Sequence, residues 1–196
     1  MKYPKTFDPI SYDYPKVIGV DPGFGSSNTG IVCLVNVDDK LVVTYSKEFE
    51  DADYSEMLAI ITNLLQTDYH SGLLSKTLVF IDGSNPEFTR TLRQVLRLDS
   101  DPYTGHKTAS RFEDLNEFGQ IIPVNFGIMG VQMLSHMQHI ASEGILAIDE
   151  SKHSNLIKQL TIAEHKDHRL EKLPTVSYDL LDALRLALLS YQFVRE

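Results

Sequence analysis

The chain has 196 residues, of which 42% are hydrophobic, one cysteine and a formal net charge of −9 at pH 7. This length and apolar content suffice for one buried core, so we expect one domain over residues 17–196 after an arm or linker over residues 1–16. The acidic balance disfavours a generic nucleic-acid coat, no apolar run is long enough to span a bilayer, and a lone Cys33 excludes an internal disulfide, which together predict a soluble intracellular protein.

Three β-rich runs open the domain. Residues 17–20 form a short buried-strand pattern that ends at the turn sequence DPG of residues 21–23. Residues 31–37 and 41–45 are joined by the polar loop 38–40, which is typical of a hairpin. Three strands in succession predict an antiparallel meander.

A helix, a strand and a second helix follow. Apolar residues recur at helical spacing over residues 54–65, and residues 77–81 form a buried-strand pattern that ends at Asp82. A helix is predicted over residues 86–98, with Pro86 at a position that tolerates its missing N–H. The polar stretch 99–119 is predicted to be a long loop.

The last part of the chain continues the alternation. It predicts strands at 121–126 and 145–148, and helices at 131–141, 155–165 and 178–193. This order indicates an α/β fold with a mixed sheet flanked by helices. We expect Cys33 and the series Met129, Met133 and Met137 to be core residues, and His136 and His139 to be surface residues and not zinc ligands.

Four aspartates stand where functional groups gather in such sheets. Asp21 ends the first strand, Asp82 ends the fourth, and Asp179 and Asp182 share one face at the start of the last helix. If the first and fourth strands are neighbours and the last helix packs across them, these carboxylates converge.

Carboxylates crowded into one cleft repel each other and recruit protons or cations. Their hard oxygen atoms suit Mg²⁺ or Mn²⁺. Two such ions about 4 Å apart can activate a water on one side of a phosphodiester and stabilise the leaving oxygen on the other. The pattern therefore indicates metal-assisted phosphodiester hydrolysis.

The sequence resembles the nuclease domains of viral terminase large subunits. The resemblance lies in VIGVDPG (17–23), VFIDG (79–83), IPVNF (122–126), GILAI (144–148) and YDLLDALRLAL (178–188), which contains the closing motif D-x-x-D-A. Many members carry another acid or a histidine beside the last aspartate, where this chain has Ser177 and Tyr178.

This resemblance implies a ribonuclease H-like mixed sheet, an antiparallel meander plus parallel strands, with helices on its faces. It implies a metal-dependent endonuclease that cuts concatemeric viral DNA during packaging, in the cytoplasm of the infected host cell. Asp21, Asp82 and Asp179 would bind two Mg²⁺ or Mn²⁺ ions, with Asp182 as an additional candidate ligand.

The expected partners are double-stranded DNA, an ATPase motor domain, the portal and the small terminase subunit, with no membrane. The string GHKT at 105–108 lacks the spacing of a phosphate-binding loop, so we expect the nuclease domain without its motor. Basic side chains in two segments are candidate contacts to the DNA backbone. They are Arg90, Lys107, Arg111, Lys152, Lys158, Lys166 and Arg169.

Three alternatives share the core fold. Residues 21–30, DPGFGSSNTG, resemble the first phosphate loop of actin-like and sugar-kinase ATPases, although those proteins need two such domains. A Holliday-junction resolvase has similar acids but usually carries a glutamate in place of Asp82. A catalytically silent module for DNA or portal docking would keep the fold without its chemistry.

Overall fold

The computed structural model describes residues 16–23, 28–38, 40–50, 53–69, 77–97, 121–166, 169–171, 173 and 176–191. The arm predicted over residues 1–16, except Lys16, and the loop predicted over residues 99–119 lie outside this part of the chain. In the described part, no helix has the length and apolar character that a membrane crossing requires.

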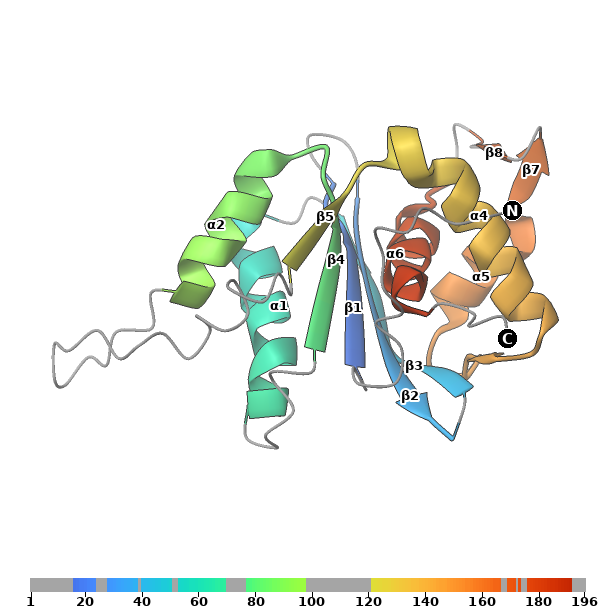
Figure 1. Ribbon diagram of the computed structural model, residues 1–196, viewed down its shortest axis with the longest axis horizontal. Helices are drawn as coiled ribbons and strands as arrows, with labels where there is room; N and C mark the ends of the chain where they lie inside the picture. The colour runs from blue at the N-terminus through green and yellow to red at the C-terminus, as the bar shows by residue number, and fades with distance from the viewer. Residues whose placement is uncertain are drawn as a thin grey trace, which may run out of the picture.

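A six-stranded mixed sheet forms the centre of the molecule (Figure 1), in the order β5-β4-β1-β2-β3-β6. Its strands are β1 (Lys16–Asp21), β2 (Thr29–Val37), β3 (Lys40–Phe49), β4 (Thr77–Asp82), β5 (Ile121–Val124) and β6 (Leu146–Ala147). Strands β1, β2 and β3 form the predicted antiparallel meander. The parallel pairs are β1 with β4, β4 with β5, and β3 with β6, which confirms the predicted mixed sheet.

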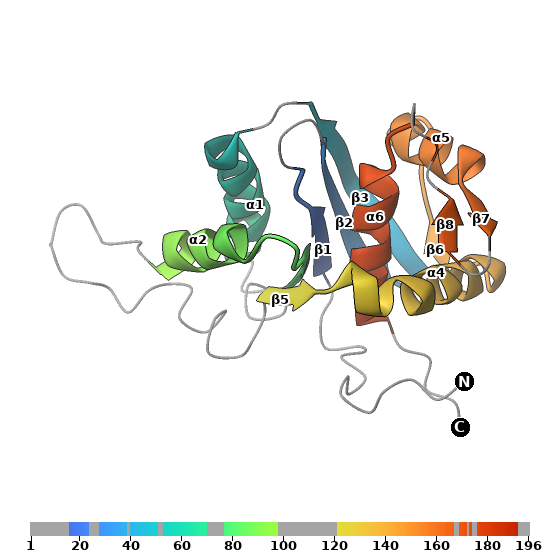
Figure 2. The ribbon, with the colours of Figure 1, turned by 90° about the horizontal axis from the view of Figure 1, so that it is seen from above.

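Helices cover both faces of this sheet. They are α1 (Tyr54–Tyr69), α2 (Pro86–Arg97), α4 (Phe126–Ser142), α5 (Ser154–Ile162) and α6 (Asp179–Ala187). Helices α1 and α2 lie on one side, and α4, α5 and α6 lie on the other (Figures 1 and 2), with α6 next to the sheet.

The side chains of β1 point alternately to the two faces of the sheet, so they contribute to a separate core on each face. Ile18 and Val20 pack in the core that includes Met57 of α1 and Phe88 of α2, whereas Val17 packs in the core that includes Leu180 of α6. Because successive side chains in a strand point to opposite faces, Gly19 and Asp21 share the α6 face with Val17.

Two glycines let α6 approach the sheet closely. A Cβ at Gly19 would lie 1.9 Å from the backbone oxygen of Ala183, and a Cβ at Gly30 would lie 2.1 Å from that of Asp179. Neither position has room for a larger residue, so helix and sheet meet through their backbones.

Several element bounds differ from the sequence-based expectations. Helix α4 begins at Phe126, five residues before the predicted start, because the side chain of Asn125 caps it by accepting a hydrogen bond from the backbone N–H of Ile128. Strand β3 runs to Phe49, past the predicted end at residue 45.

The end of the chain contains more elements than expected. Helix α5 ends at Ile162, and the short hairpin of β7 (Glu164–Lys166) and β8 (Arg169–Glu171) follows it. The final helix predicted over 178–193 is α6 followed by the 3-10 segment η2 (Leu188–Ser190).

His136 is buried, which corrects its predicted surface position, whereas Cys33, Met133 and Met137 are core residues as predicted. The His136 ring contacts the Leu188 backbone oxygen through Nε2 at 3.0 Å. Burial lowers the pKa of His136 below 6.5, although backbone hydrogen bonds oppose the shift. The residue therefore serves helix packing as a neutral side chain.

Candidate active site

Asp21 and Asp82 lie side by side at one edge of the sheet. Strands β1 and β4 are parallel, and their register pairs Val20 with Ile81, so the two aspartates are the next residues on neighbouring strands. Adjacent strands lie about 4.8 Å apart. Asp82 shares the α6 face with Phe80, two residues before it, as Asp21 does with Gly19.

Helix α6 brings Asp179 to the same edge. Gly30 pairs directly with Asp21, and the first residue of α6 sits on Gly30, with the Asp179 backbone oxygen in the place that a Cβ would fill. Asp21 and Gly30 lie at the end of the sheet away from the β2–β3 hairpin turn. The turn is at the bottom of Figure 1, so this edge is at the top, where α6 begins. The structure thus places three of the four predicted acids along one edge of the sheet.

The Asp82 carboxylate is oriented by the turn that follows it. It accepts hydrogen bonds from the backbone N–H of Ser84 at 3.2 Å and from the Ser84 hydroxyl at 2.6 Å. The backbone N–H of Gly83 donates to the Val124 oxygen at 2.7 Å, which ties the turn to β5. The turn that ends β4 therefore also positions its acid.

Asp182, the fourth predicted acid, is turned into the protein. Only 2% of its surface is exposed, and its Oδ1 atom accepts a hydrogen bond from Arg185 Nη1 at 2.6 Å. Arg185 Nη2 donates to the Gly130 backbone oxygen at 2.7 Å, and the guanidinium lies 5.3 Å from the centre of the Phe126 ring. This carboxylate therefore neutralises an arginine between α6 and α4.

Glu48 is a neighbouring acid that the sequence-based reasoning missed. It pairs with Gly30 across β2 and β3, so it lies on the α6 face in line with Asp21. Its carboxylate and that of Asp179 both lie within hydrogen-bonding distance of the Ser177 hydroxyl. The β3 strand pattern continues beyond residue 45. Extending the hairpin register along it would have placed Glu48 opposite Gly30.

These side chains offer the hard oxygen donors that Mg²⁺ and Mn²⁺ prefer. Within the described residues, no three Asp, Glu, His or Cys side chains already converge at metal-binding distance. Rotation about χ1 and χ2 moves an aspartate carboxylate, so acids at adjacent strand positions on one face can approach a shared cation. The donor chemistry and the shared face fit a divalent cation.

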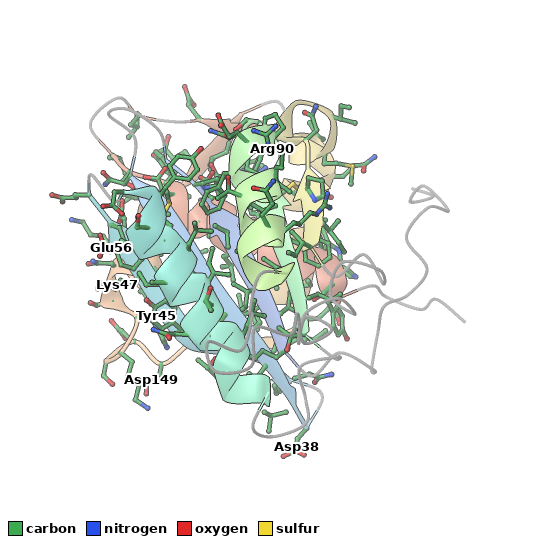
Figure 3. All side chains as sticks on the ribbon, turned by 90° about the vertical axis from the view of Figure 1, so that its left-hand side faces the viewer. Asp38, Tyr45, Lys47, Glu56, Arg90 and Asp149 are labelled. Carbon is green, nitrogen blue, oxygen red and sulfur yellow. The ribbon has the colours of Figure 1, made fainter. Side chains whose placement is uncertain are left out.

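The predicted DNA-contacting residues fall in different regions. Arg90 is exposed on α2 and lies 3.5 Å from Glu87, and Figure 3 places it toward the upper end of the molecule. Lys152 pairs with Asp149 at 3.3 Å, and Asp149 lies toward the lower end of that view. The structure therefore does not bring Arg90 and Lys152 together.

The other predicted contacts divide into two groups. Lys158 is exposed on α5, next to Gln159, whose side chain reaches Glu48. Lys166 and Arg169 belong to the β7–β8 hairpin, but their side chains are outside the described part, as are Lys107 and Arg111 altogether. Arg90, Lys152 and Lys158 are therefore the candidates for the DNA backbone whose side chains the structure describes.

Solved structures with a similar fold include large terminases of phages. The nuclease domain of the bacteriophage SPP1 large terminase with bound Mn has a TM-score of 0.58 at 12% identity, over 91% of this chain and 87% of that one. The nuclease of thermophilic phage G20c with bound magnesium has a TM-score of 0.57 at 15% identity, over 92% and 83%.

A longer large terminase from another thermophilic bacteriophage, also solved in complex with ATP-γ-S, has a TM-score of 0.61 at 9% identity. There the match covers 92% of this chain but only 40% or 41% of the other chain. No protein-family model and no curated protein matches this sequence. At these identities the likeness establishes the fold, which is the predicted ribonuclease H-like fold.

Proposed function

We propose that this chain is a divalent-metal-dependent endodeoxyribonuclease of the terminase type. The observation that carries the proposal is the placement of three acids at one sheet edge: Asp21 and Asp82 end neighbouring parallel strands on the same face, and α6 seats Asp179 beside Asp21. Carboxylates from separate segments, gathered at the ends of strands, are the arrangement that metal-dependent hydrolysis requires.

Asp21, Asp82 and Asp179 would hold two Mg²⁺ or Mn²⁺ ions. When bound, such ions activate a water at neutral pH and neutralise the charge that builds on the phosphate. The similar nucleases of phages SPP1 and G20c, solved with Mn and magnesium bound, support this choice of metal. Asp182 is the weakest of the four candidates, because Arg185 already neutralises its buried carboxylate.

The protein's own groups have distinct tasks in this proposal. The Ser84 hydrogen bonds orient the Asp82 carboxylate before a cation binds, and the packing of α6 on Gly30 holds the Asp179 backbone next to β1 and β2. The first turn of α6 contributes the positive end of a helix dipole at the same edge. Arg90 and Lys158, which are exposed on α2 and α5, would contact the DNA backbone.

The same likeness supports a proposal for the biological role. We propose that the chain cuts concatemeric viral DNA during genome packaging, in the cytoplasm of the infected host cell. Double-stranded DNA would be its substrate, and an ATPase motor domain, the portal and the small terminase subunit its partners. The longer phage terminase, which extends well beyond the matched region and was solved with ATP-γ-S, supports a motor domain as partner.

A plasmid-nicking assay tests the activity. The parent should nick supercoiled DNA with Mg²⁺ or Mn²⁺ and not with EDTA. Asp21→Asn, Asp82→Asn and Asp179→Asn should each lower the rate about 100-fold or more, because metal-supported charge stabilisation contributes several kcal/mol and each ~1.4 kcal/mol is tenfold in rate.

Asp38→Asn is the matched control, because Asp38 is exposed in the hairpin turn at the opposite end of the sheet (Figure 3). Its φ of 48° is a conformation that asparagine adopts readily. Equal cleavage by the parent and the three site variants would disprove the proposal. Preference for four-way junctions over linear duplex would assign the site to a resolvase.

A further inference from the structure

The Glu48 carboxylate is held by donors from three separate segments. Its Oε1 atom accepts from Asn28 Nδ2 at 2.8 Å and from the Ser177 hydroxyl, and its Oε2 atom accepts from Gln159 Nε2 at 2.9 Å. Asn28 precedes β2, Gln159 belongs to α5, and Ser177 precedes α6. Both carboxylate oxygens are therefore engaged within the protein.

This network continues to Asp179 through Ser177. The Ser177 hydroxyl lies 2.6 Å from Asp179 Oδ2, and the backbone N–H of Asp179 points back to Ser177 Oγ at 3.4 Å. A hydroxyl has one hydrogen to donate, so it can serve only one of the two carboxylates at a time. The orientation of Asp179 therefore depends on how Glu48 holds Ser177.

A second connection runs through Gln159. Its Nε2 atom donates to Glu48, and its Oε1 atom accepts from the backbone N–H of Leu181 at 3.1 Å. The Leu181 N–H belongs to the first turn of α6, where backbone donors have no partner within the helix. Gln159 is 5% exposed, so this bond forms away from water. Glu48 is thus tied to the start of α6 by two routes.

We propose that Glu48 is a positioning residue that sets the Asp179 carboxylate for cation binding, acting through Ser177 and Gln159. The inference rests on the proposed function, in which Asp179 is a metal ligand. Glu48 lies across β2 from Asp21, about 10 Å away at the usual strand spacing. Its place and its engaged oxygens favour a role through Asp179 over direct coordination.

The test measures Mn²⁺ affinity by calorimetry on the full chain without DNA, so the readout does not depend on cleavage. Glu48→Gln keeps the shape but replaces one acceptor oxygen with an amide that faces the donors of Asn28, Ser177 or Gln159. We expect Mn²⁺ binding to weaken about 10- to 100-fold, the usual effect of losing a group that orients a metal ligand.

Glu56→Gln is the matched control, because Glu56 is exposed on α1 on the other side of the sheet (Figure 3) and its replacement removes the same charge. Ser177→Ala should weaken Mn²⁺ binding as Glu48→Gln does, which provides a second route if one variant unfolds. Melting temperatures measured in EDTA identify an unfolded variant.

A double variant separates positioning from coordination. If Glu48 acts through Asp179, then Glu48→Gln should add little to the loss caused by Asp179→Asn, whereas independent ligands give losses that multiply. Multiplying losses, or a folded Glu48→Gln that binds Mn²⁺ as the parent does, would overturn the inference.

The nicking assay shows which proposal has failed. A parent that cleaves DNA with Mn²⁺, together with a Glu48→Gln variant of unchanged affinity, would leave the proposed function standing and remove the role of Glu48. A parent that neither binds Mn²⁺ nor cleaves DNA would remove both.

Discussion

Asp179 and Asp182 lie one turn apart in α6 and have different surroundings. Their spacing places both on one side of α6, yet Asp179 meets Ser177 at the sheet edge while Asp182 meets Arg185 in the interior. The exposed fractions of the Arg185 and Asp182 side chains are 5% and 3%, so water screens this ion pair little. Removal of one partner would leave the other charge buried and uncompensated.

Arg185→Met should therefore lower the free energy of unfolding by about 3–5 kcal/mol, as measured by urea denaturation. Arg90→Met is the matched control: Arg90 and Glu87 have the same three-residue spacing in α2, but their side chains are 68% and 71% exposed. Such a surface pair contributes at most about 1 kcal/mol. Equal losses in the two variants would show that the buried pair has no special role in stability.

At the scale of elements, the packing of α6 against β1 and β2 decides where Asp179 lies. This packing depends on Gly19 and Gly30, whose missing side chains let the backbone of α6 approach the sheet. The hydrogen bonds between Glu48 and Gln159, and between Gln159 and the backbone N–H of Leu181, then hold the start of the helix. Packing and polar contacts thus position the same residue from two directions.

Gly30→Ala should push the first turn of α6 away from the sheet. Its Cβ would lie 2.1 Å from the Asp179 backbone oxygen, and a backbone atom cannot move aside as cheaply as the end of a flexible side chain. We expect a loss of about 1–3 kcal/mol in unfolding free energy, the usual cost of overpacking, together with weaker Mn²⁺ binding.

Gly130→Ala in α4 is the control for this substitution. A Cβ there would meet only the end of the Arg185 side chain, at 3.7 Å, which is ordinary contact. Because alanine is the better helix former by about 1 kcal/mol, this variant should be as stable as the parent or more stable. A Gly30→Ala variant with the stability and Mn²⁺ affinity of the parent would show that the close packing of α6 on Gly30 does not position Asp179.

At the scale of the whole molecule, an acidic protein is proposed to bind a polyanion. With a net charge of −9, the protein as a whole would repel DNA, so the proposed binding would depend on a few local cations such as Arg90 and Lys158. Few phosphate contacts give weak binding that depends on salt. Divalent ions at the site would reduce the repulsion where the DNA is cut.

DNA affinity should accordingly fall about tenfold or more between 50 mM and 200 mM salt, as expected for a few phosphate contacts. Fluorescence anisotropy with a labelled duplex, in Ca²⁺ or EDTA to prevent cleavage, measures this dependence. Arg90→Gln should lower both the affinity and its salt slope, whereas Asp38→Asn should change neither. An affinity that is the same at both salt concentrations would contradict this view of binding.

Much of the fold was predictable from local signals. Strand patterns, the turns after Asp21 and Asp82, and the helical spacing around Asp179 depend on neighbouring residues, so the sequence by itself determined the meander, the mixed sheet and the candidate acids. The early start of α4 was missed, because Gly127 and Gly130 weaken the helical signal while Asn125 caps the helix.

Only the tertiary structure decided what surrounds each acid. The β2–β3 register, which shifts at an irregularity between Cys33 and Leu34, places Glu48 next to the site. Gln159 of α5, far along the chain, hydrogen-bonds to it. The preference for Asp179 over Asp182 likewise depends on what each carboxylate meets across the fold. Local sequence sets backbone conformation and side-chain periodicity, whereas the partners of a buried charge are set by packing between distant segments.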